Sequence, residues 1–121
     1  MTKNLALVIE DDEDLSDIFT KALEQAGFEV EKITDGKTAQ QRLQRENVPN
    51  VIALDLHLPF VDGATLLKFV HADERFLNTK VILTTADAVQ AEFLREQATI
   101  VLIKPIAFTQ LRDISARLKA G

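Results

Sequence analysis

The feature of this sequence that most restricts its fold is a regular alternation of short apolar runs with amphipathic stretches. The runs are between three and six residues long, which is typical of strands covered on both faces. Strict alternation of such strands with helices predicts a parallel sheet with helices on both of its faces. In chain order, the runs are Leu5–Ile9, the weaker Phe28–Ile33, Val51–Leu56, Val81–Leu83 and Ile100–Ile103.

The stretches between and after the runs carry apolar residues at helical spacing. Gly27 follows the first stretch and marks its end. At this chain length the common arrangement is a doubly wound, flavodoxin-like α/β fold, with a five-stranded parallel sheet of order 2-1-3-4-5 and five helices. We expect that fold, in one domain over residues 1–121, although periodicity alone leaves the strand order open. The expected helices lie within Leu15–Ala26, Lys37–Asn47, Leu66–Val70, Val89–Leu94 and Phe108–Leu118.

The composition narrows the class of protein. The chain is 46% hydrophobic and 27% charged, which is ordinary for a globular domain, and no apolar run approaches the length of a membrane span. It contains no cysteine, which excludes disulfides and thiolate metal sites and agrees with a cytoplasmic location. The net charge is −5 and no basic block is present, so direct binding of nucleic acid by this domain is not favoured. We therefore expect a cytoplasmic domain that contacts neither a membrane nor nucleic acid.

Two of the apolar runs carry carboxylates at their ends, although burying an unpaired charge is costly. Glu10, Asp11 and Asp12 follow the first run, and Asp55 lies near the end of the third. Ligands of open parallel sheets bind beyond the carboxyl ends of the strands, so these side chains are expected to line one shallow pocket. Carboxylates that share a pocket raise one another's pKa, and a hard divalent cation such as Mg²⁺ relieves that repulsion.

The fourth and fifth runs bring a hydroxyl and an ammonium group to the same edge. Thr84 and Thr85 end the fourth run, and Lys104 follows the fifth. With a metal held by the first carboxylates, Asp55 has one oxygen for the metal and one to attack a phosphorus atom, as in enzymes that form aspartyl phosphates. The metal, the ammonium and a threonine hydroxyl then share the charge of the transferring group.

Each residue also has a purely structural interpretation. The acidic residues after the first run are expected at a helix N-cap, and an aspartate before a proline is common in turns. A threonine in a strand often reflects β-propensity alone, and Lys104 is a typical loop residue. The occurrence of all four at one edge of the sheet, in complementary roles, favours the chemical interpretation.

At these residues the sequence resembles the receiver domain of bacterial two-component response regulators, over essentially the whole chain. The family has an acidic pair after the first strand, a phosphoacceptor aspartate with a following proline and glycine, a Ser/Thr before alanine, and a Lys-Pro pair. In this sequence these are Asp11-Asp12, Asp55 with Pro59 and Gly63, Thr85-Ala86, which aligns better than Thr84, and Lys104-Pro105.

The resemblance implies that Asp55 takes a phosphoryl group from the phosphohistidine of a sensor histidine kinase or a phosphotransfer protein. Mg²⁺ is the implied cofactor, Thr85 turns toward the phosphoryl group, and Lys104 pairs with it. The implied metal ligands are Asp11, Asp12, Asp55 and the backbone carbonyl of His57.

The resemblance also implies a switch of the face formed by the fourth helix, fifth strand and fifth helix, which controls an unidentified downstream partner. A homodimer formed on phosphorylation is one form that this output takes in the family. The domain is not an enzyme beyond its own phosphorylation and dephosphorylation, and the bond before Pro105 is often cis in the family.

The sequence departs from the family on the output side. Val101 stands where the family often has an aromatic residue, only eighteen residues separate Thr85 from Lys104, and Gln97 replaces a common glycine. A shortened fourth helix is therefore expected. Phe60 is expected to be exposed after Pro59, where it contacts a kinase or shields the pocket.

Three other functions remain as alternatives. A phosphatase of the haloacid dehalogenase kind needs a second carboxylate two residues after the nucleophile, and here that residue is His57. A flavin carrier needs a phosphate-binding loop after the first strand, where this chain is acidic. A receiver-like docking or dimerisation module that does not signal by phosphorylation agrees with the altered output side, whereas the retained pocket residues oppose it.

Overall fold

The computed structural model describes residues 4–119 and contains one five-stranded sheet. All neighbouring strands are parallel, and their order is β2-β1-β3-β4-β5, as the sequence predicted. All five carboxyl ends therefore lie at one edge of the sheet. The strands are β1 (Leu5–Ile9), β2 (Glu29–Ile33), β3 (Val51–Asp55), β4 (Lys80–Thr85) and β5 (Ile100–Ile103).

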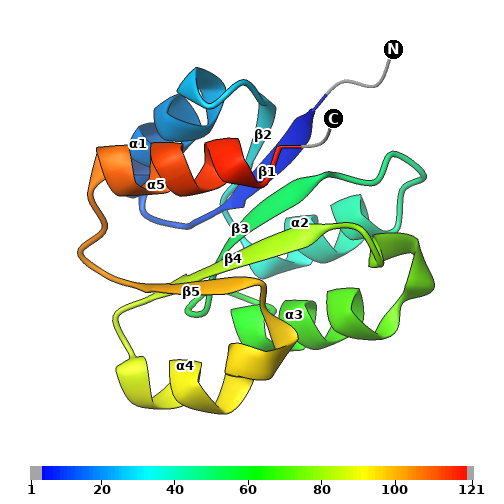
Figure 1. Cartoon of the computed structure of the whole chain (residues 1–121). Coiled ribbons are helices and arrows are strands. Elements are labelled where there is room, and N and C mark those ends of the chain that lie inside the picture. The colour runs from blue at the N-terminus through cyan, green and yellow to red at the C-terminus, as the bar shows by residue number, and fades with distance from the viewer. Residues whose placement is uncertain (1–3, 120–121) are drawn as a thin grey trace.

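Five α-helices cover the two faces of the sheet (Figure 1). The first and last pack side by side on one face, and the other three lie on the opposite face. Two short 3-10 helices, Glu74–Phe76 and Arg95–Gln97, precede β4 and β5. The α-helices are α1 (Glu13–Gln25), α2 (Gly36–Leu43), α3 (Gly63–Ala72), α4 (Ala88–Leu94) and α5 (Phe108–Arg117).

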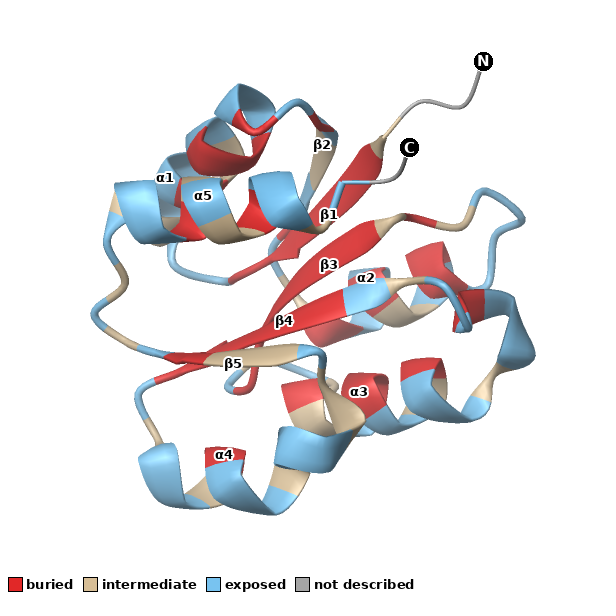
Figure 2. Cartoon of the chain, viewed as in Figure 1, coloured by how far each residue is buried: buried red, intermediate tan, exposed pale blue. Residues whose placement is uncertain are grey.

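The three inner strands of the sheet, β1, β3 and β4, are buried on both faces and almost continuously apolar, whereas the edge strands β2 and β5 are less buried (Figure 2). Side chains alternate between the faces along each strand and build two separate core clusters. Leu7 and Ile9 belong to the cluster beneath α2 and α3, whereas Ala6 and Val8 belong to the cluster beneath α1 and α5. The strand side chains on a given face therefore follow a period of two, and this period also places the polar residues at the carboxyl edge.

The helix α2 ends earlier than the sequence pattern predicted, whereas α4 is as short as expected. The sequence pattern predicted a helix over Lys37–Asn47, but α2 ends at Leu43, because the Arg75 guanidinium donates to the backbone carbonyls of Leu43 and Arg45 and satisfies the end of the helix. The expected short fourth helix is confirmed, since α4 has 7 residues and is followed by a 3-10 turn.

An aspartate begins each helix that follows one of the first four strands. In each case a side-chain oxygen accepts a hydrogen bond from the backbone N–H three residues later, at 2.7–3.0 Å, which satisfies one free donor of the first turn. These N-caps are Asp12, Asp35, Asp62 and Asp87. They fix the point at which the chain leaves each strand end and turns into a helix.

Replacing the α3 cap should lower stability in a defined way. We expect Asp62→Ala to reduce the free energy of unfolding by about 1 kcal/mol, and Asp62→Asn, which keeps an acceptor, to be near neutral. The hydrogen bond from the Thr65 N–H holds the Asp62 pKa below its usual value. The cap therefore contributes above the ordinary aspartate pKa of about 3.9, and its contribution is lost as the pH falls through the lowered value. Urea unfolding followed by circular dichroism at pH 7 and pH 3 tests this; equal losses for the alanine and asparagine variants would contradict it.

Candidate functional site

The period of two along the strands brings charged residues together at the carboxyl edge. Val8 and Ala53 lie in the core cluster beneath α1 and α5. Glu10 and Asp55, two residues further along, therefore point to the same face, and Lys104 has the equivalent position after β5. The ends of β1, β3 and β5 thus direct two carboxylates and one ammonium group into a single space, and the ammonium reaches across the end of β4.

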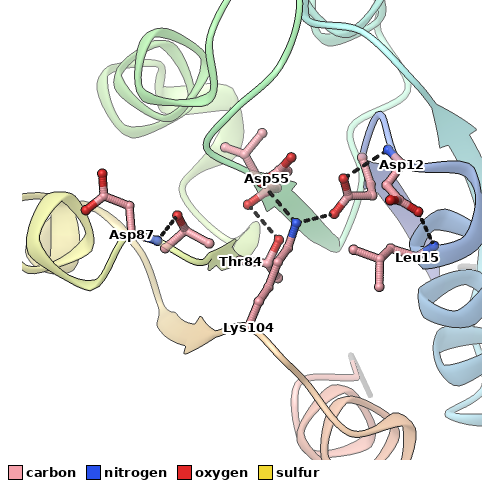
Figure 3. Close-up of polar contacts among 9 residues, drawn as sticks. Asp12, Leu15, Asp55, Thr84, Asp87 and Lys104 are labelled. Carbon is pink, nitrogen blue, oxygen red and sulfur yellow. Dashed lines mark hydrogen bonds and ion pairs between the residues drawn. The ribbon is translucent and has the colours of Figure 1, made fainter.

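Lys104 connects the two buried carboxylates. Its Nζ donates to Glu10 Oε1 at 2.7 Å and to Asp55 Oδ1 at 3.3 Å (Figure 3). Glu10 and Asp55 are only 2% and 3% exposed, whereas the Lys104 side chain is 19% exposed. The ammonium therefore approaches from the open side of the pocket and lies within reach of a group bound to Asp55.

The pocket carries more negative charge than Lys104 neutralises. Burial raises the pKa of Glu10 to about 7, the hydrogen bond from Lys104 opposes this rise, and the Asp55 charge adds to it. Burial works to lower the pKa of Lys104, but the hydrogen bond to Glu10 and the charge of Asp55 raise it overall. Lys104 is therefore protonated. It lies beside Glu10, whose anionic form is disfavoured.

A third carboxylate completes a set of oxygen donors that suits a hard metal ion. Glu10, Asp11 and Asp55 each offer an oxygen, and these oxygens lie within 4.8 Å of one another. Asp11 is exposed, so the group opens to solvent on that side. Oxygen ligands together with access for several waters are what Mg²⁺ requires, and its charge would offset the excess of carboxylates. The residues present therefore fit the ion that the sequence analysis expected.

Asp12 has a different place from its neighbours. Its Oδ1 accepts from the Leu15 N–H at 3.0 Å as the N-cap of α1, and its own backbone N–H donates to Glu10 Oε2 at 3.2 Å (Figure 3). It is not part of the carboxylate group that Glu10, Asp11 and Asp55 form. Of the expected acidic pair, the geometry thus brings Asp11 to the pocket and gives Asp12 a capping role.

Glu10 is the candidate metal ligand that the sequence did not predict. It was recognised at the end of the first strand but not included among the ligands. The signal that would have identified it is the alternation itself, because Ala6, Val8 and Glu10 share one face of the strand that also carries Asp55 on its neighbour.

The two threonines at the end of β4 differ in their surroundings. Thr84 is the register partner of Asp55, and its Oγ1 donates to the Leu54 carbonyl at 3.4 Å. Thr85 is fully buried, and its Oγ1 accepts from the Asp87 N–H at 2.9 Å. Thr85 is therefore the threonine whose hydroxyl contacts the loop that leads into α4, whereas Thr84 belongs to the sheet.

The loop between β3 and α3 closes tightly over the end of β3. The Gly63 N–H donates to the Leu56 carbonyl at 2.8 Å, and a Cβ on Gly63 would lie 2.1 Å from the Asp55 carbonyl oxygen, so this position accepts only glycine. His57 is exposed in this loop. The expected glycine after the phosphoacceptor thus has a steric reason in the structure.

The remaining expectations concern the output side. The Lys104–Pro105 bond is cis. Val101, at the position where the family often has an aromatic residue, is half-buried and packs against the core cluster beneath α3. On α4, Val89 and Phe93 are exposed.

Comparison with known proteins identifies the family to which this arrangement belongs. The family model described as the response regulator receiver domain matches residues 6–116. The chain belongs to this family. Receiver domains act as phosphoacceptors in two-component signalling, and they interact with histidine kinases and with downstream effectors. Among residues 4–119, no helix is both long enough and apolar enough to cross a membrane.

Individual relatives agree with this assignment. The chain is 35% identical to the phosphate regulon transcriptional regulatory protein PhoB of Rhizobium meliloti over 93% of its own length and 49% of the relative. It is 40% identical to the DNA-binding dual master transcriptional regulator RpaA of Synechocystis over 66% of its length and 33% of that protein. The chain thus spans between a third and a half of these curated relatives. The chemotaxis response regulator CheY4 of Vibrio cholerae shares the fold, with a TM-score of 0.84 at 24% identity over 97% of this chain and 99% of that one.

Removing the buried charge of Glu10 should have opposite effects with and without metal. Without Mg²⁺ at pH 8, we expect Glu10→Gln to raise the free energy of unfolding by about 1 kcal/mol, because burial and the Asp55 charge disfavour the Glu10 anion and the amide can still accept from Lys104. With saturating Mg²⁺ the wild type should gain more stability than the variant. Urea unfolding with a chelator and with Mg²⁺ measures both. A less stable variant in the chelator would show that the Glu10–Lys104 pair stabilises the fold overall.

Proposed function

We propose that Asp55 is the phosphoacceptor of this domain and that its donor is a phosphohistidine on a kinase or a phosphotransfer protein. The observation that carries the proposal is the position of Asp55, buried at the carboxyl end of the central strand with its Oδ1 3.3 Å from Lys104 Nζ. Its neighbours Glu10 and Asp11 supply the negative surroundings that a divalent cation favours.

The transfer is a substitution at phosphorus. A carboxylate oxygen of Asp55 forms the new O–P bond while the N–P bond of the phosphohistidine breaks, and the departing imidazole keeps the electron pair and takes up a proton from solvent. Lys104, already within hydrogen-bond distance of Asp55, pairs with the phosphoryl oxygens. When Lys104 donates to the phosphoryl group, its hydrogen bond to Glu10 becomes weaker.

Mg²⁺, when bound, supplies positive charge that stabilises the transferring phosphoryl group. Glu10, Asp11 and Asp55 would hold it, with the backbone carbonyl of His57 as a further ligand. Asp12 as a ligand stays a prediction from the sequence, and its hydrogen bond to Leu15 favours Asp11 and Glu10 instead.

The switch runs from Thr85 to α4. In the unphosphorylated state Thr85 Oγ1 accepts from the Asp87 N–H, and the Asp87 side chain caps α4 through the Gln90 N–H at 2.9 Å. When the Thr85 hydroxyl turns to donate to a phosphoryl oxygen, its bond from the Asp87 N–H is lost, and the backbone at the N-cap of α4 can shift. The face formed by α4, β5 and α5 then differs between the two states and controls the downstream partner.

Phosphorylation by a small donor is the first test of this function. We expect the wild type to gain one phosphoryl group from acetyl phosphate only when Mg²⁺ is present, and Asp55→Asn to gain none, because the amide is not a nucleophile toward phosphorus. Intact-mass measurement with and without a chelator records the adduct. A folded wild type that binds Mg²⁺ and forms no adduct would contradict the proposal and leave a docking module that does not signal by phosphorylation.

Adjacent acidic residues provide a matched test of the metal site. We expect Asp11→Asn to weaken Mg²⁺ binding at least about tenfold, because it removes a charged ligand from the group. Asp12→Asn should keep both the affinity and the α1 cap, since asparagine caps helices as well as aspartate does. Calorimetric titration with Mg²⁺ compares the two. A larger loss of Mg²⁺ affinity for Asp12→Asn would show that Asp12 is a metal ligand, as the sequence predicted.

A further inference from the structure

Phe60 combines two features that nothing in the fold requires. It is 84% exposed, and its φ is +72°, in the left-handed region that bulky residues rarely adopt. Among the residues that the structure describes, it is the only one other than glycine with a positive φ. A large aromatic side chain thus occupies a strained position where glycine or asparagine would cost less, and strain of this kind is concentrated at functional sites.

The strain comes from a tight turn that is held in place. The Val61 N–H donates to the Pro59 carbonyl at 2.9 Å, which closes a γ-turn with Phe60 at its centre, and γ-turns with positive φ are rare. The same carbonyl accepts from the Gly36 N–H at 3.0 Å, so the turn is also tied to the start of α2. A Cβ on Gly36 would lie 1.6 Å from the Val61 carbonyl oxygen, which shows how closely the two segments approach. The turn is therefore fixed at its tip.

The apolar residues two before and one after Phe60 pack inward. Leu58 and Val61 pack against the core cluster beneath α3, and the hydrogen bond from Gly63 to Leu56 closes the base of the loop. Phe60 is the large apolar side chain of this loop that faces solvent, where the smaller or polar residues His57, Pro59 and Asp62 are exposed as well. A rigid, exposed aromatic loses little conformational entropy on binding, which is the property of residues that dominate protein interfaces.

We propose that Phe60 is an anchor for the phosphohistidine-bearing protein, held in an apolar site on the surface of that partner. The proposal rests on the function proposed above for Asp55. Asp55 is only 3% exposed and is reached at the carboxyl edge of the sheet, and the loop that carries Phe60 begins directly after it. A protein that brings a histidine to Asp55 therefore covers this loop, whereas a small phosphodonor does not need to touch its apex.

The test compares transfer from a protein donor with transfer from a small donor. The probes are a panel of purified, phosphorylated histidine-kinase cores, of which the fastest donor to the wild type is kept, and acetyl phosphate. Phe60→Asn removes the ring but tolerates positive φ, Phe60→Tyr keeps a ring, and Leu77→Ala removes an equally exposed apolar side chain, 83% exposed, from the opposite edge of the sheet.

We expect Phe60→Asn to slow transfer from the kinase core by about tenfold or more, the loss typical of an anchoring aromatic, and to leave the rate with acetyl phosphate unchanged. Phe60→Tyr and Leu77→Ala should transfer at the wild-type rate from both donors. The ratio of the two rates separates recognition of the partner from the chemistry at Asp55.

Other outcomes would overturn the inference. Unchanged transfer to Phe60→Asn, or a wild type that accepts from acetyl phosphate but from no core of the panel, would show that Phe60 anchors no donor. An equal loss with both donors would assign Phe60 to positioning of the pocket. Self-association of the wild type that Phe60→Asn abolishes would assign the side chain to a second copy. No phosphorylation from acetyl phosphate would instead contradict the proposed function of Asp55, on which the inference rests.

Discussion

The contacts of Lys104 with two buried carboxylates are the interaction on which the rest of the site depends. Glu10 and Asp55 come from neighbouring strands and repel each other, and the ammonium 2.7 Å and 3.3 Å away supplies one positive charge between them. Asp11 adds a further carboxylate at the solvent side. The pocket therefore carries more negative than positive charge. This excess suits the proposed site, which would accept a divalent cation and then a phosphoryl group.

The sheet creates this pocket through geometry that the chain cannot easily change. Parallel strands deliver all their carboxyl ends to one edge, and the period of two selects which residue at each end points into the pocket. The aspartate N-caps then turn the chain away into helices, so the pocket stays open above the sheet. Asp12 illustrates the division of roles, since one residue after Asp11 its carboxylate serves the helix.

The fold was largely predictable from the sequence, and the site was predictable in part. Short apolar runs and their alternation with helices predicted the parallel sheet, because a sheet covered on both faces needs apolar strands, whereas its order was expected only as the common arrangement at this chain length. The end of α2 at Leu43 was not predictable, since it depends on Arg75, which lies thirty-two residues away in sequence. The motif alignment places the acidic pair at Asp11 and Asp12, whereas the carboxylates that lie together with Asp55 are Glu10 and Asp11, a difference that depends on which side chain points to the pocket at the end of β1. The strained turn at Phe60 had no sequence signal, because phenylalanine is not a residue that predicts positive φ.

The altered output side has a physical consequence for signalling. Where an aromatic side chain could rotate and report phosphorylation, Val101 is a small β-branched residue packed against the core, with little room to change its rotamer. The remaining connection between pocket and output face is the chain of hydrogen bonds from Thr85 through Asp87 to Gln90. A helix of 7 residues is marginal in isolation, so it depends strongly on the position of Asp87, whose side chain caps it and whose backbone N–H donates to Thr85. In the function proposed for this domain, the order of the short α4 therefore depends on Thr85 and Asp87, and this helix would have the switching role that a rotating aromatic often has in the family.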